Sequence, residues 1–101
     1  MNIIALSSHA LKRMFGRYIT SDAVLLTLHY GEQIEQDGAR LFHLGRRQMP
    51  TFLSPAKASR IEGITVVVSR DGVVLTVYRQ RDIPRKLRRR GRIGIIPGAA
   101  A

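Results

Sequence analysis

Two runs of β-branched residues separated by an Asp-Gly pair constrain the fold of this chain more than any other feature. The first run is Ile64–Ser69 and the second is Val73–Arg79, with Asp71 and Gly72 between them. Valine, isoleucine and threonine favour the extended backbone of a strand, and Asp-Gly favours the tight turn that joins antiparallel strands. The pattern therefore predicts a β-hairpin over this stretch.

Side chains along the second strand of this hairpin should alternate between two faces of a sheet. One face would carry Val73, Leu75, Val77 and Arg79, and the other Val74, Thr76, Tyr78 and Gln80. Because neighbouring residues of a strand point to opposite sides, the two sets cannot share a surface. We expect the first set to meet helices and the second to lie on the open face.

Two helices are expected near the N-terminus, each preceded by hydroxyl side chains and followed by a glycine. The first runs from Ser7 or Ser8 to Gly16, and the second runs from Thr20 or Ser21 to Gly31. Serine and threonine cap the first free N–H groups of a helix, and glycine commonly ends one. These signals fix the positions of both helices in the chain.

The first of these helices is amphipathic, and its polar side carries a histidine. The apolar side would consist of Ala10, Leu11, Met14 and Phe15, and the polar side of His9, Lys12 and Arg13. We expect the apolar side to pack on the sheet and His9 to face solvent or a ligand. An imidazole one turn from a guanidinium suits phosphodiester cleavage, although a solvated helix face has the same composition.

The remaining segments complete an α+β fold. Gln33–Asp37 and Arg40–Leu44 flank a glycine and indicate a second hairpin, and residues 2–6 favour a short strand. Residues 45–62 contain two prolines and are expected to form a loop. We therefore expect one α+β domain over residues 1–80.

The charge of the chain indicates a polyanionic partner. Seventeen Lys and Arg residues against seven Asp and Glu give a formal net charge of +10. Arginine supplies most of this charge, and its planar guanidinium suits phosphate contact and base stacking. RNA or another polyanion is therefore the expected partner, and an acidic protein would be attracted by the same charge.

Eight of the seventeen basic residues lie between Arg79 and Arg92, so residues 81–101 are expected to form a flexible basic arm after the domain. Within this arm the residues expected to contact phosphate are Arg85, Lys86, Arg88, Arg89 and Arg90.

Several functional classes are disfavoured by the composition. The chain contains no cysteine, its three histidines are scattered and its few acids are dispersed, so no metal site and no cofactor are expected. His29 is interpreted as a helix-terminal residue and His43 as a surface residue of a strand. No apolar run approaches the roughly 20 residues of a membrane-spanning helix, and no secretory signal is present, so we expect a cytoplasmic protein without membrane contact.

Four short motifs, in this order, resemble a bacterial family of small domains of unknown function. They are His9–Met14 (His-Ala-x-x-Arg-Met), Arg17–Ile19 (Arg-x-Ile), Gly31–Ile34 (Gly-Glu-x-Ile) and Val74–Tyr78 (Val-x-Thr-Val-Tyr). The resemblance covers about residues 3 to 80. That family is usually grouped with the RelE, barnase, EndoU and colicin-type nucleases, many of which are metal-independent ribonuclease toxins.

The resemblance implies a RelE-like fold, with two N-terminal helices packed on one face of an antiparallel sheet of about four strands. The closing strand would then face the first helix. His9 and Arg13 would then form a catalytic site with Thr76 and Tyr78, while Arg17 and Arg79 would bind phosphate. The expected activity is metal-independent cleavage of RNA, and the partner would include an acidic antitoxin. The alternative is a module without catalysis that binds nucleic acid or a protein through its basic arm.

Overall fold

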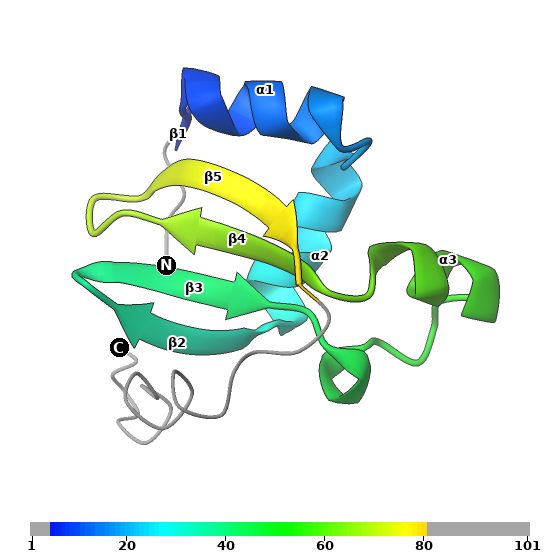
Figure 1. Ribbon diagram of the computed structural model, residues 1–101. Coiled ribbons are helices and arrows are strands. Elements are labelled where there is room, and N and C mark those ends of the chain that lie inside the picture. Colours follow the sequence, from blue (N-terminus) through cyan, green and yellow to red (C-terminus); the bar gives the residue numbers. More distant parts are fainter. Residues whose placement is uncertain (1–4, 81–101) are drawn as a thin grey trace.

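In the computed structural model, which describes residues 5–80, a five-stranded sheet carries α1 and α2 on one face (Figure 1). The strands are β1 (Ala5–Leu6), β2 (Glu32–Gln36), β3 (Ala39–His43), β4 (Ile64–Val68) and β5 (Val73–Arg79). The helices are α1 (Ser8–Gly16), α2 (Ser21–Tyr30) and α3 (Pro55–Ile61), with a 3-10 turn, η1 (Arg46–Gln48). The strands lie in the order β1-β5-β4-β3-β2. The α+β class and the placement of the two N-terminal helices are confirmed.

The sheet is mixed and has five strands, so the prediction of an antiparallel sheet of about four strands is confirmed only in part. Within residues 5–80, the antiparallel pairs are β2 with β3, β3 with β4, and β4 with β5. In contrast, β1 pairs in parallel with β5, with Ala5 opposite Val73 and Leu6 opposite Val74. A strand of two residues carries no sequence pattern that selects a partner or a direction. The parallel direction fits the path of the chain, because β1 leads directly into α1, which runs along β5 in the same direction as that strand (Figure 1).

Both predicted hairpins are confirmed, and their turns use backbone conformations that glycine adopts readily. In the β2–β3 turn Asp37 and Gly38 both have positive φ, 50° and 81°. In the β4–β5 turn Gly72 has φ of 91°. Two successive positive φ values characterise the turn that matches the twist of antiparallel strands, so the β2–β3 register is set by its local sequence.

A β-bulge interrupts the pairing of β4 with β5. Val67 lies opposite Thr76, yet the next residue of β4, Val68, lies opposite Val74, so Leu75 is an extra residue in β5. A bulge places two residues of one strand against one of its partner and reverses the alternation of side chains beyond it.

Because of the bulge, some side chains of β5 lie on another face of the sheet than strict alternation predicts. Val74 and Val77 are both fully buried and belong to the core beneath the helices, whereas Leu75 is 40% exposed. Thr76 and Tyr78 still share one face, on the side of the sheet away from the helices, opposite Val67 and Thr65 of β4. Strict alternation assigned Val74 to the wrong face, because no residue pattern in β5 marks the bulge.

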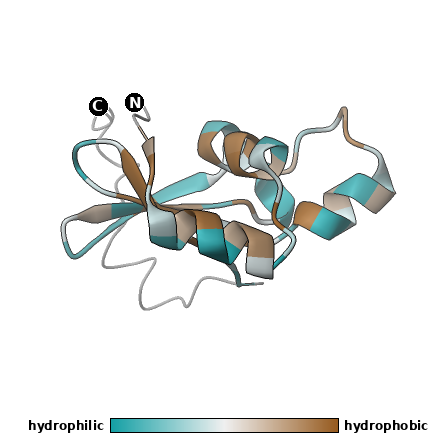
Figure 2. Cartoon of the chain, turned by 90° about the horizontal axis from the view of Figure 1, so that it is seen from above, coloured by the Kyte–Doolittle hydropathy of each residue, from teal (hydrophilic) through white to brown (hydrophobic). Residues whose placement is uncertain are grey.

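Helix α1 buries a narrower stripe than its sequence predicts. Ala10 and Met14 are buried, but Leu11 is 42% exposed and Phe15 is 80% exposed, so these two do not belong to the core. Hydrophilic and hydrophobic residues alternate along this helix in the view from above (Figure 2). The helix contacts chiefly β5, near the edge of the sheet, and one strand covers only part of the apolar side.

The segment 45–62 is not the loop that its prolines suggest. It contains η1 and α3, and α3 begins where Ser54 accepts a hydrogen bond from the backbone N–H of Lys57 and Pro55 occupies the first turn. Proline fits the first turn of a helix because the N–H that it lacks would have no partner there. The Ser54-Pro55 pair was therefore the sequence signal for the start of this helix. Hydrophobic periodicity gave no signal, because a helix of seven residues is too short to show it.

The predicted N-caps are confirmed, and one of them also fastens α1 to the sheet. The Ser7 hydroxyl accepts from the backbone N–H of Ala10 at 3.0 Å and donates to the carbonyl of Leu75 at 3.0 Å. The backbone N–H of Ser7 donates to the carbonyl of Val74 at 3.0 Å. Thr20 caps α2 in the same way, through Ala23. Ser7 thus determines where α1 begins relative to β5.

Replacing Ser7 with alanine should lower the free energy of unfolding by about 1–2 kcal/mol, because the helix loses its cap and the carbonyl of Leu75 loses a donor. Urea unfolding followed by circular dichroism measures the change. Ser8→Ala is the matched control, since Ser8 is exposed and the cap is made by Ser7. Equal unfolding free energies for the two variants would contradict the anchoring role.

Candidate functional site

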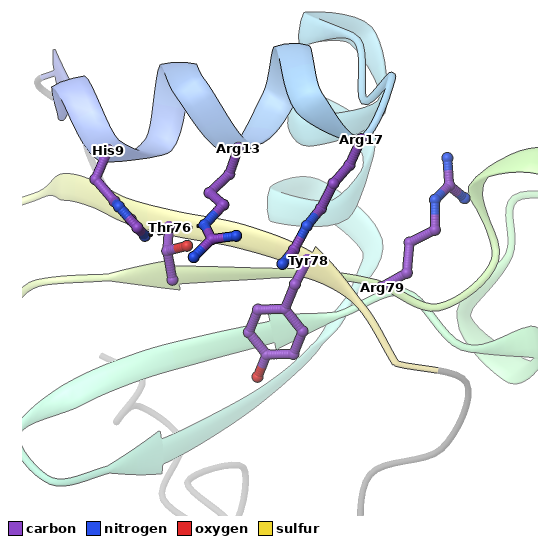
Figure 3. Close-up of a pocket in the computed structure, with 6 residues that line it drawn as sticks. All are labelled: His9, Arg13, Arg17, Thr76, Tyr78 and Arg79. Carbon is purple, nitrogen blue, oxygen red and sulfur yellow. Dashed lines mark hydrogen bonds between the residues drawn. The ribbon is translucent and has the colours of Figure 1, made fainter.

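An open groove lies between α1 and β5 and contains most of the site residues that the sequence predicts (Figure 3). Its volume is about 600 Å³. The lining residues are His9, Arg13 and Arg17 from α1 and Thr76, Tyr78 and Arg79 from β5. Every residue of this set was selected from the sequence, and the tertiary structure brings them to one surface.

The α1 wall of the groove is a row of three basic side chains. His9, Arg13 and Arg17 follow one another at four-residue intervals, so each lies one helical turn from the next, about 5.4 Å along the axis. All three are exposed, and their side chains point from the helix toward β5 (Figure 3). No acidic side chain lines the groove among residues 5–80, so its potential is positive.

A hydrogen bond joins two members of this row. The Arg13 Nε–H donates to Nε2 of His9 at 3.4 Å. A guanidinium can only donate, so Nε2 is the acceptor in this contact. The contact is long and solvent-exposed, so a stronger acceptor can take Arg13 away from the ring.

The third member of the row is tied to the sheet. Nη1 of Arg17 donates to the carbonyl oxygen of Val77 at 3.3 Å. A guanidinium has five N–H groups in a planar fork, so one bond to the backbone leaves donors for a ligand. This bond holds Arg17 against β5.

The β5 wall presents two hydroxyl groups on the open side of the sheet. Thr76 and Tyr78 are both half-buried, and the Tyr78 hydroxyl points away from α1 (Figure 3). Burial raises the pKa of Tyr78 above its ordinary value of 10.0, because the surroundings disfavour the charged phenolate. At neutral pH the hydroxyl therefore stays protonated and can donate a hydrogen bond.

Arg79 lines the groove at its end but directs its charge elsewhere. Its Nη1 donates to the carbonyl oxygen of Arg60 in α3. In Figure 3 its guanidinium stands apart from the other three basic side chains. The structure thus gives this predicted phosphate ligand a bond that joins β5 to α3.

A buried polar pair lies on the same face of the sheet as Tyr78. His43 is 1% exposed, so the interpretation of this residue as a surface histidine is wrong. Its Nδ1 lies 2.9 Å from the hydroxyl of Thr65, which donates to the carbonyl of Gly63 at 3.2 Å. Thr65 is the cross-strand neighbour of both His43 and Tyr78. The apolar residues that flank His43 in sequence were the signal for burial.

Other sequence predictions fall outside the groove or outside the described residues. His29 lies in the last turn of α2, with its ring 4.5 Å from that of Tyr30. The residues expected to bind phosphate in the basic arm, Arg85, Lys86, Arg88, Arg89 and Arg90, lie outside residues 5–80. Within that range no three His, Asp or Glu side chains gather as a metal site, and no helix is long and apolar enough to span a membrane.

These features define a small α+β domain with a cationic surface groove at the helix–sheet edge. Residues 6–79 match the family model described as "Domain of unknown function (DUF4258)", and the chain belongs to this family. No curated protein and no solved structure matches the chain. The predicted membership of a family of uncharacterised domains is confirmed, and the wider likeness to nucleases stays a prediction.

The raised pKa of Tyr78 predicts a loss of stability at alkaline pH. The folded protein binds the phenolic proton more tightly than the unfolded chain, so this contribution is fully present below pH 10.0 and is lost as the pH rises through the folded-state pKa. Urea unfolding over a pH series should show the decline in the wild type and a weaker one in Tyr78→Phe. Parallel pH profiles for the two proteins would contradict the assignment.

Proposed function

We propose that the groove between α1 and β5 binds the phosphodiester backbone of RNA and cleaves it without a metal ion. The observation that carries this proposal is the row of His9, Arg13 and Arg17, in which a proton acceptor contacts one guanidinium and a second guanidinium follows one helical turn further on. Cleavage of RNA by its own 2′-hydroxyl needs a base at that hydroxyl and positive charge at the phosphorus. The row provides both within two helical turns.

His9 is the general base of the proposed reaction, and Arg13 controls its availability. In the unliganded groove Arg13 donates to Nε2 of His9. A phosphate attracts a guanidinium more strongly than a neutral imidazole does, because the hydrogen bond is then formed between opposite charges. Binding of the substrate therefore draws Arg13 to the phosphate and frees Nε2 to take the proton from the 2′-hydroxyl.

The bonds that change are those at the phosphorus. The 2′-oxygen forms a new bond to phosphorus as His9 takes its proton, and the bond from phosphorus to the 5′-oxygen breaks. The 5′-oxygen takes a proton from a water molecule that the open groove admits, and the hydroxide that remains takes the proton held by His9. The other product is a 2′,3′-cyclic phosphate. Arg13 and Arg17 stabilise the added charge on the non-bridging oxygens, and the hydroxyl of Thr76 is a further donor.

Replacing His9 with alanine should reduce RNA cleavage by about 10²- to 10⁴-fold, the usual contribution of a general base. The assay uses the full chain, a labelled RNA and excess chelator, and the product is analysed for the cyclic phosphate end. His29→Ala is the matched control, because His29 lies on α2 outside the groove. Equal cleavage by wild type and His9→Ala would remove His9 from the site.

The alternative is binding without cleavage, in which the basic arm supplies the affinity. It is favoured by the high density of basic residues after β5, where residues 81–101 hold seven of them. Dense positive charge binds polyanions without any catalytic group. The two functions differ in one property, since only the first requires His9.

Replacing Arg85, Lys86, Arg88, Arg89 and Arg90 with glutamine in the full chain tests the role of the arm. If these residues contact phosphate, the dependence of log affinity on log salt should become flatter by about 0.7 for each lost contact on a single strand. Fluorescence anisotropy with a labelled single-stranded RNA measures this slope. An unchanged slope would show that the arm does not contact the nucleic acid.

A further inference from the structure

We propose that the groove takes a single strand of nucleic acid, and that the ring of Tyr78 is the platform on which one of its bases stacks. The inference rests on the proposed binding of RNA in this groove, and it adds the form of the ligand and a binding role for Tyr78. It does not depend on cleavage.

The first argument is the position of the Tyr78 ring. It lies on the face of the sheet away from the helices and lines the groove, with its hydroxyl directed away from α1 (Figure 3). No other aromatic ring within residues 5–80 stacks on it, since the ring contacts there join His29, Tyr30 and Phe52. Its half-buried ring is therefore held by the sheet and still reaches the surface of the groove.

The second argument is the rigidity of the floor beside this ring. Thr65, the cross-strand neighbour of Tyr78, is fully buried, and its hydroxyl bonds both the His43 ring and the carbonyl of Gly63. A buried hydroxyl with two partners does not move freely. Stacking of a base on Tyr78 therefore costs less conformational entropy of the protein than stacking on a mobile surface side chain would cost.

The third argument is the arrangement of charge opposite the ring. His9, Arg13 and Arg17 form a line on α1 with a spacing of about one helical turn, 5.4 Å. The sugar-phosphate backbone of an extended strand can run along this line against α1, with its bases toward β5. In a duplex the bases are paired and stacked inside the helix, so none can reach Tyr78.

The experiment uses the full chain and a short 2′-O-methyl oligonucleotide, whose blocked 2′-oxygen prevents cleavage by this mechanism. Fluorescence anisotropy compares this ligand with an abasic strand of equal phosphate number and with the corresponding duplex. We expect the wild type to prefer the strand with bases over the abasic strand by roughly 5- to 150-fold, the range for stacking of one base. The duplex should show no more affinity per phosphate than the abasic strand.

Substitutions of Tyr78 identify the platform. Tyr78→Phe keeps the ring and should keep the preference for bases, whereas Tyr78→Leu keeps an apolar side chain on the strand and should abolish it. Tyr18→Leu is the matched control, because Tyr18 is 89% exposed and lies outside the groove. Thermal unfolding of each variant confirms that the fold is retained.

The inference is overturned if the wild type shows no preference for bases, or if the preference survives in Tyr78→Leu. Equal affinity per phosphate for duplex and single strand would also overturn it. Because the ligand is not cleaved, these outcomes are independent of the cleavage assay. If the wild type cleaves RNA but shows no preference for bases, only the stacking role of Tyr78 is rejected. If the wild type prefers bases but does not cleave RNA, only the proposed reaction is rejected.

Discussion

The packing of α1 against β5 is the contact on which the rest of the structure depends. Ala10 and Met14 of the helix join Val74 and Val77 of the strand in one buried cluster. Burial of a valine side chain stabilises a fold by about 1.5–3 kcal/mol, so these contacts outweigh the single bonds of Ser7 and Arg17 that accompany them. Both walls of the groove belong to this contact, and a loss of packing would separate them.

The bulge at Leu75 lets β5 place two valines in the core beneath the helices and two hydroxyl side chains in the groove. Without the extra residue, Val74 and Val77 could not both point beneath the helices. With it, the two valines pack under α1 while Thr76 and Tyr78 remain together on the other face. Bulges often re-aim side chains in this way beside functional sites.

The groove is open and strongly charged, and these two properties affect binding differently. Water and salt screen exposed charges, so the net charge of +10 mainly attracts polyanions from a distance. Discrimination among them must come from groups with fixed positions. Arg17 is fixed by the carbonyl of Val77, and Tyr78 lies beside the buried hydroxyl of Thr65. In the proposed function, the net charge supplies general attraction, and Arg17 and Tyr78 supply local recognition.

Several features of this protein depend only on neighbours along the chain. Hydroxyl caps such as Ser7, the Asp-Gly turns and the four-residue spacing of His9 and Arg13 have local causes, so they were predictable. Contacts between distant segments set the parallel pairing of β1, the bulge at Leu75 and the exposure of Phe15. Each of these depends on which distant segment lies beside the residue, and no local pattern encodes that contact. The groove depends on local and on long-range features. Its lining residues could be selected from the sequence, but folding brings α1 and β5 together.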